Sequence, residues 1–172
     1  MAGERCSLCG KDAAFYSNYL KQYLCKKHLE KMLFRRINAT LLSAGLRKSA
    51  YSVPKGDSPG ARMLQFMFRN NTGEGVKLEA NTLDDFAAAL MSHFAFSRKI
   101  RISISSLRRF NPLYTTSDEE ISSLLSIKGI KFSGKKRDRE DLYALEMLSD
   151  LERRRPGAML SIVKVGARLG LI

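Results

Sequence analysis

The chain has 172 residues, a formal net charge of +13 and a hydrophobic fraction of 44%. This length and hydrophobic content favour one domain, or one domain with a small attached module, and exclude a disordered tail. No apolar run reaches the ~18 residues of a membrane span, and the N-terminus, MAGERCSLCGK, lacks a signal-peptide pattern. Three cysteines, an odd number, favour a metal site in an intracellular, cytoplasmic protein over a disulfide scaffold.

The positive charge gathers at the two ends of the chain. The net charge is +7 over residues 1–57, −1 over residues 58–97 and +7 over residues 98–172. Such an excess indicates a polyanionic partner, and nucleic acid is the default, although a solvated surface or an acidic protein also fits. The candidate RNA-binding residues are the densest basic clusters: Lys26, Lys27, Arg35, Arg36, Arg108, Arg109, Lys135, Lys136, Arg137, Arg153, Arg154 and Arg155.

The N-terminal segment carries the pattern Cys-x2-Cys-x15-Cys-x2-His, formed by Cys6, Cys9, Cys25 and His28. Two close pairs of sulfur and nitrogen ligands are what tetrahedral Zn²⁺ needs. The pattern uses every cysteine, so a closed, structural zinc site is expected and no thiol remains for catalysis. The other histidine, His93, is expected in the core or at its edge.

The next segments read as a basic helix and a linker. Apolar residues at three- and four-residue spacing predict a helix over residues 27–47. Residues 49–62 hold two prolines and two glycines and predict a loop. Residues 63–69 fit either a strand or a short buried helix.

The rest of the chain alternates between strand and helix patterns. Short strands are predicted at 76–80, 99–104 and 129–132. Helices are predicted from Thr82 to about Phe96, from Ser117 to about Ile127, over 137–155, and over the last apolar segment, 159–172. This alternation predicts an α/β fold with a small parallel sheet and flanking helices.

Four stretches resemble the archaeal and eukaryotic cytosolic tRNA 2-thiouridine synthetases, which are PP-loop ATPases with an N-terminal zinc finger. They are the Cys6–His28 finger with its following helix, VKLEANTLDDFAAALM at 76–91, NPLYTTSDEEISSLLSIKGI at 111–130, and residues 142–163. The resemblance implies a truncated PP-loop, HUP-like domain. The expected organisation is a finger at 1–30, a basic helix and linker at 31–56, and a degenerate PP-loop-type α/β domain at 57–172.

The departures from the family concern its chemistry. The phosphate-binding Ser-Gly-Gly-x-Asp-Ser loop is absent, and the nearest residues, Lys55 to Gly60, have another order. The catalytic Cys-x-x-Cys-Gly segment aligns with residues 56–60, which places Gly56 and Pro59 at the cysteine positions. Leu83, Asp84 and Asp85 remain from the nucleotide-side motif. This alignment also favours a helix over 61–71.

The expected function is therefore that of a non-catalytic protein, not an enzyme, that binds Zn²⁺ and RNA, with tRNA first and rRNA second. An accessory role beside a full-length thiolation enzyme is consistent with this, and no membrane partner is expected. Alternatives are a structural protein of the ribosome or another RNA particle, a residual ATP-binding protein that uses Asp84 and Asp85, and a protein-interaction scaffold.

Overall fold

The computed structural model describes residues 3–46, 50–69, 73–106 and 108–172. The expected break at 70–72 lies outside these residues. The first helix, expected to reach residue 47, ends at Ser43. The elements in chain order are β1 (Phe15–Ser17), β2 (Gln22–Leu24), α1 (Lys26–Ser43), β3 (Tyr51–Ser52), α2 (Pro59–Met67), β4 (Val76–Leu78), α3 (Leu83–Phe96), β5 (Ser105–Ser106), β6 (Arg109–Phe110), α4 (Asp118–Ile127), α5 (Arg139–Arg154) and α6 (Ala158–Arg168).

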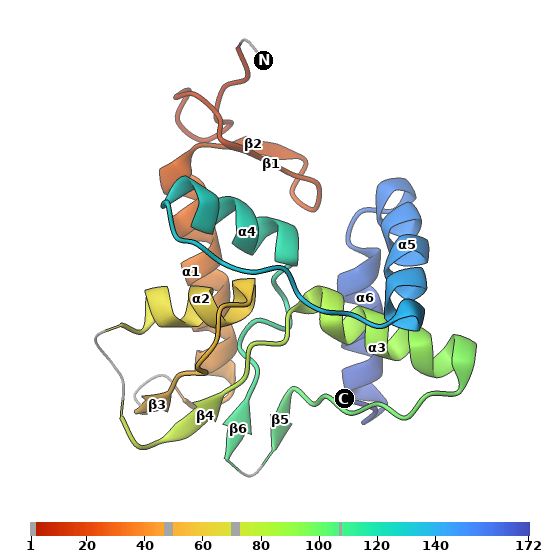
Figure 1. Ribbon diagram of the computed structural model, residues 1–172. Coiled ribbons are helices and arrows are strands. Elements are labelled where there is room, and N and C mark those ends of the chain that lie inside the picture. Colours follow the sequence, from red (N-terminus) through yellow and green to blue (C-terminus); the bar gives the residue numbers. More distant parts are fainter. Residues whose placement is uncertain (1–2, 47–49, 70–72, 107) are drawn as a thin grey trace.

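A small sheet with strand order β3-β4-β6-β5 lies at the opposite end of the molecule from the N-terminal hairpin β1–β2 (Figure 1). Strands β3, β4 and β6 are parallel, whereas β5 runs antiparallel to β6. Only two residues separate β5 from β6, too few for the crossover that parallel strands need. The predicted α/β class with flanking helices is confirmed, with a mixed sheet.

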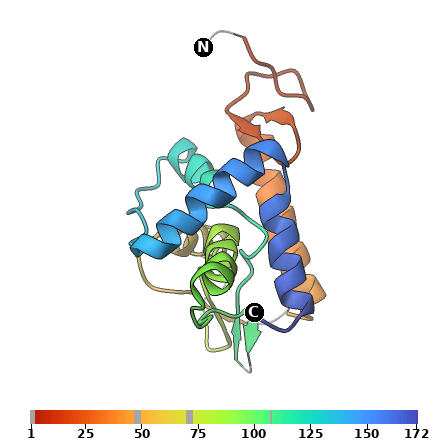
Figure 2. The same cartoon turned by 90° about the vertical axis from the view of Figure 1, so that its right-hand side faces the viewer.

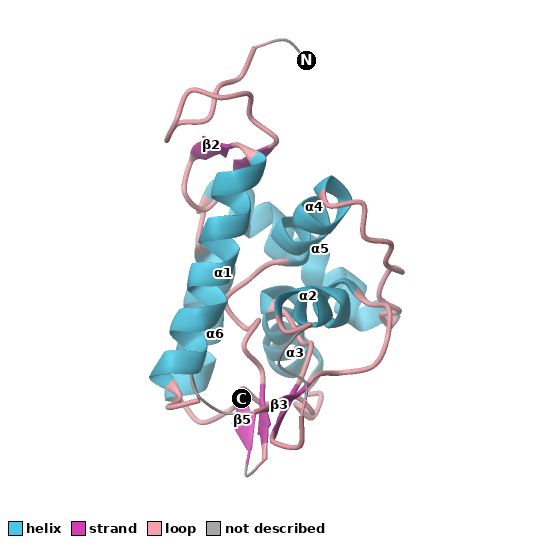
Figure 3. Cartoon of the chain, turned by 90° about the vertical axis from the view of Figure 1, so that its left-hand side faces the viewer, coloured by secondary structure: helices cyan, strands magenta, loops and turns pink. Residues whose placement is uncertain are grey.

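The helices form two groups, each around its own hydrophobic cluster. One cluster gathers apolar side chains of α1, α2 and α4 with the sheet, and the other gathers those of α3, α5 and α6. Helix α1 descends from the hairpin toward the sheet (Figure 3), while α5 and α6 lie together on the other side (Figure 2). None of the described helices combines the length and hydropathy that crossing a membrane requires.

Two of the predicted strands are wrong. Residues 99–104 form no strand, because Ile100 and Ile102 alternate to pack on the cluster of α3, α5 and α6 rather than to pair with a neighbouring strand. Residues 129–132 close a helix instead. Gly129 has a φ of +69° and the Ile130 N–H donates to the Leu125 carbonyl at 2.9 Å, which is a Schellman-type end of α4.

The predicted loop over residues 49–62 is also wrong in part. It contains β3, whose Tyr51 is buried in the first cluster, and it contains the first residues of α2. The Ser58 hydroxyl accepts from the Ala61 N–H at 3.3 Å and caps this helix, and Pro59 occupies its first position. The helix favoured by the family alignment is present and begins at Pro59.

Helix starts were the most predictable local feature. Thr82 and Ser117 each form a capping box, with Asp85 closing the box of α3 and Glu120 that of α4. Acidic residues lie in the first turns of α3 and α4, where their negative charge stabilises the positive end of the helix dipole.

Gly60 marks the closest approach of α2 to the β4–α3 connection. A Cβ at this position would lie 2.3 Å from the Ala80 carbonyl oxygen. We expect Gly60→Ala to lower the free energy of unfolding by about 1–3 kcal/mol through overpacking, measured by urea denaturation of the metal-loaded protein.

Gly134→Ala is the matched control, because a Cβ at Gly134 meets nothing within 4 Å. This variant should be neutral or slightly more stable. Equal stability of the two variants would contradict the close approach at Gly60.

Candidate functional site

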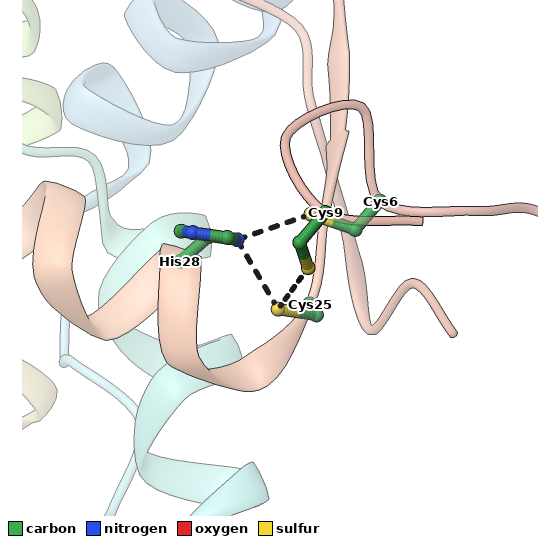
Figure 4. Close-up of side chains that lie close together, drawn as sticks. All are labelled: Cys6, Cys9, Cys25 and His28. Carbon is green, nitrogen blue, oxygen red and sulfur yellow. Dashed lines mark hydrogen bonds between the residues drawn. The ribbon is translucent and has the colours of Figure 1, made fainter. Parts of the chain in front are cut away.

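The four predicted metal ligands converge at the base of the N-terminal hairpin. Cys6 and Cys9 lie in the turn before β1, Cys25 is the residue before α1, and His28 lies in the first turn of that helix. Their ligand atoms all lie within 4.8 Å of one another, and the side chains point toward one another (Figure 4).

The separations of the ligand atoms match a single tetrahedral ion. The Cys9 Sγ lies 3.7 Å from the Cys25 Sγ, and the His28 Nδ1 lies 3.3 Å from the Cys6 Sγ and 3.4 Å from the Cys25 Sγ. Metal–sulfur bonds of about 2.3 Å and metal–nitrogen bonds of about 2.0 Å at tetrahedral angles give edges of about 3.8 and 3.5 Å. The cluster can therefore hold one metal ion.

The surroundings of Cys6 favour its thiolate. Burial raises the pKa of the Cys6 thiol, but hydrogen bonds from the backbone of Cys25 and Leu8 and from the His28 side chain outweigh burial. Together they lower the pKa to about 6. Because the thiolate is the form that binds metals, this ligand is largely in its binding form at neutral pH.

A second group of charged side chains lies where β4 and β6 end and helices α3 and α4 begin. Asp85 of α3 and Asp118 of α4 face Lys135 and Arg137 from the segment before α5. The Lys135 Nζ lies 2.8 Å from Asp118, and the Arg137 guanidinium lies 2.9 Å from Asp85. All four side chains are at least four-fifths buried, so two positive and two negative charges compensate one another away from bulk water.

Asp84, the neighbour of Asp85, is turned to another partner. Its Oδ2 accepts from the backbone N–H of Asp118 at 2.7 Å, which ties the start of α3 to the start of α4. Burial, with the nearby charge of Asp118, raises the pKa of the Asp84 carboxyl to about 6. Asp84 and Asp85, the two aspartates that sequence comparison placed in a nucleotide-side motif, thus have partners inside the chain.

The structure divides the candidate RNA-binding residues among separate surfaces. Lys26, Lys27 and Arg35 are exposed on α1 beside the metal cluster, whereas Arg36 is largely buried and pairs with Glu120 at 2.6 Å. Arg153, Arg154 and Arg155 lie at the end of helix α5, and Arg153 lines the same cavity as Tyr19 in the turn of the N-terminal hairpin.

The remaining candidates lie elsewhere. Arg108 and Arg109 lie on the β5–β6 hairpin, at the far end of the molecule from the metal cluster (Figure 1), and Arg109 faces Glu79 at 3.3 Å. Lys135 and Arg137 belong to the buried charge group, so of that cluster only Lys136 is exposed.

Sequence reasoning missed two sets of basic residues. Lys31 completes a row with Lys27 and Arg35 on one exposed face of α1, because four-residue steps repeat on one side of a helix. Arg98, Lys99 and Arg101 line a cleft of about 730 Å³ beside α3, together with Lys136. The helical spacing 27, 31, 35 was readable in the sequence, but the cleft depends on tertiary contacts.

Together, the mixed sheet, the two helical groups and the cysteine–histidine cluster define an α/β protein with a potential metal-binding module at its N-terminus. Its fold is similar to that of a solved tRNA thiolase, described as "U34-tRNA thiolase NcsA from Methanococcus maripaludis with its [4Fe-4S] cluster". The TM-score is 0.79 at 14% sequence identity, over 98% of this chain and 88% of that chain. No protein-family model and no curated protein matches the sequence. At this identity, the likeness establishes the fold.

The raised pKa of Asp84 predicts a pH dependence of stability. The folded state binds a proton more tightly than the unfolded chain, so this group's contribution to stability falls as pH rises from about 4 to about 6. Asp84→Asn keeps an oxygen acceptor for the Asp118 N–H and removes the charge. We expect this variant to be more stable than the parent at pH 7, by up to about 3 kcal/mol.

The measurement is urea denaturation of both proteins from pH 4 to pH 8. The difference between them should shrink as the pH falls and become small near pH 4, since the carboxyl is then protonated in the folded state and only about half ionised in the unfolded chain. A variant that is less stable than the parent at pH 7 would show that the ionised carboxylate stabilises the fold.

Proposed function

We propose that this chain is a non-catalytic protein that binds Zn²⁺ and RNA, with tRNA as its RNA, in keeping with its tRNA-thiolase fold. The observation that carries the proposal is the basic row formed by Lys27, Lys31 and Arg35 next to the metal cluster. All three side chains are exposed. Within the described residues, no carboxylate lies within 4.0 Å of any of them.

The basic row suits a phosphate backbone. Residues four apart on a helix are neighbours on one face, so the three charges form a line along α1. Lys26 adds a fourth exposed charge next to Lys27, at the N-terminal end of this line. Each such residue that neutralises a phosphate releases counterions, which supplies affinity without base recognition. The charges of Arg36, Lys135 and Arg137 are compensated by carboxylates, so we assign them a smaller part in RNA contact.

The non-catalytic part of the proposal is supported by how the helix starts are satisfied. Phosphates bind to open N-termini of helices at the carboxyl ends of parallel strands. Here Ser58, Thr82 and Ser117 occupy those positions with their own side chains, and the acidic residues of α3 and α4 repel an anion. All three cysteines lie in the metal cluster, which leaves no other thiol for sulfur transfer.

Zinc is the proposed metal because the four ligand atoms are close enough to share one ion. In a [4Fe-4S] cluster each cysteine binds a different iron, so the thiolates surround a four-iron cluster and are farther apart than the ligands of a single ion. The closed set of three thiolates and one imidazole leaves no open position, which is typical of a structural zinc site.

The metal is tested by elemental analysis of the purified full chain. We expect about one zinc per chain and neither iron nor the visible absorption of an iron–sulfur cluster. Cys9→Ser should lose most of the metal, because it removes one of four ligands. His93→Ala is the control, since the His93 Nδ1 faces the Arg98 carbonyl at 2.7 Å, outside the ligand set. Iron with inorganic sulfide would overturn the assignment.

RNA binding is tested by fluorescence anisotropy with labelled tRNA between about 50 and 200 mM salt. We expect affinity to fall steeply with salt. The double variant Lys27→Gln/Lys31→Gln should bind more weakly. It should also lower the slope of log affinity against log salt by about 1 for each phosphate that the variant no longer neutralises.

Arg108→Gln/Arg109→Gln is the matched control, because it removes the same charge at the far end of the molecule. It should lose less affinity for tRNA than the α1 variant, because Arg109 already faces Glu79. Absence of binding at low salt, or binding without a salt slope, would refute the RNA proposal. An equal loss of affinity in both variants would show that net charge, not the row on α1, determines affinity.

A further inference from the structure

A cavity of about 320 Å³ lies between the N-terminal hairpin and the body of the protein. Three parts of the chain enclose it: the turn of the hairpin with Tyr19, the starts of α3 and α4, and the end of α5 with the turn into α6. Its volume is in the range of roughly 300–1,000 Å³ typical of small-molecule sites, which often lie where two modules meet.

The walls combine an aromatic surface with convergent polar groups. Phe15 and Tyr19 line one side, and the Tyr19 ring is about half exposed. Asp84 and Thr115 line the other side. Within the described residues, the buried Thr115 hydroxyl has no hydrogen-bond partner, a state that is rare in folded proteins. An apolar cavity with a few convergent polar groups is the usual form of a binding site.

The charges of the cavity restrict what it can hold. Of its four carboxylates, Glu120 pairs with Arg36, and Glu152 accepts from the N–H groups of Gly157 and Met159. Asp84 and Glu119 keep acceptor oxygens that have no partner among the described residues. The interior is therefore suited to a flat group that donates N–H and unsuited to a phosphate.

We propose that this cavity binds an unpaired nucleobase of the RNA, uracil or guanine, whose ring N–H donates to the Asp84 carboxylate while the Tyr19 ring contacts its face. This inference rests on the proposed RNA-binding function and adds base recognition to it. Bases extruded from single-stranded RNA are commonly held by aromatic stacking and by hydrogen bonds to the edge that pairs in a duplex.

The surroundings of the cavity fit the rest of the nucleotide. Arg153 lies at its wall, and Arg154 follows it at the end of α5; both side chains are about three-quarters exposed. A phosphate next to the bound base would meet these guanidinium groups outside the cavity, where solvent is present. The acidic interior thus suits the base, and the basic residues at the rim suit the neighbouring phosphate.

The test uses nucleosides, which carry no phosphate and so report on the cavity alone. Saturation-transfer difference NMR on the metal-loaded full chain compares uridine with 3-methyluridine and guanosine with 1-methylguanosine. We expect signal from the parent nucleosides and about tenfold weaker binding of the methylated ones, which lack the ring N–H. Asp84→Asn, which removes the negative charge and adds N–H donors, should weaken uridine binding by a similar factor.

A pair of serine variants supplies the control for access. Ser149→Phe places a large side chain at the cavity wall and should abolish nucleoside binding, whereas Ser126→Phe, on the exposed side of α4, should leave it unchanged. Equal binding of uridine and 3-methyluridine, no nucleoside binding at all, or equal behaviour of the two serine variants would overturn the inference.

The tRNA titrations distinguish the two proposals. If tRNA binds with a steep salt slope while nucleosides do not bind, base recognition is refuted and the RNA function stands. If nucleosides bind as expected while tRNA does not, the cavity assignment stands and the RNA function is refuted. Weaker tRNA binding by Ser149→Phe at an unchanged salt slope would support both, since the loss of affinity then comes from a base and not from phosphates.

Discussion

The compensated group of Asp85, Asp118, Lys135 and Arg137 joins the two halves of the molecule. Helix α3 belongs to one hydrophobic cluster and α4 to the other, and the basic pair comes from the segment that leads into α5. Because the charges lie largely away from water, each side chain needs its partners, and removing one would leave an uncompensated charge. The group therefore fixes where the helix starts meet and where the second helical group begins.

This constraint also bears on chemistry. The edge of the sheet at which α/β proteins commonly bind phosphates is the edge at which this chain places its own carboxylates and capping hydroxyls. An anion would have to displace Asp85 and Asp118 before it reached Lys135 and Arg137. The same arrangement leaves the exposed basic residues on α1 and at the end of α5 to meet a polyanion away from that edge.

The sequence allowed prediction of features that depend on near neighbours in the chain. The ligand spacing predicted a cluster that the structure brings together, and the capping residues Thr82 and Ser117 marked two helix starts. Features that depend on distant partners were not readable. The alternation at residues 99–104 reflects burial against α3, α5 and α6, and nothing local to Lys135 reveals that it faces Asp85 rather than solvent.

The position of the metal cluster connects the two surfaces assigned to RNA. Cys25 and His28 flank the start of α1, so a bound ion would fix the rotation of that helix relative to the hairpin, and hence the direction of the row at Lys27, Lys31 and Arg35. Cys6 and Cys9 precede the first strand of the hairpin, whose turn carries Tyr19, and Tyr19 and Gly157 both line the cavity. In the proposed function, the ion is therefore structural and does not contact RNA. It orients the basic row on α1 toward phosphates and the Tyr19 wall of the cavity toward a base.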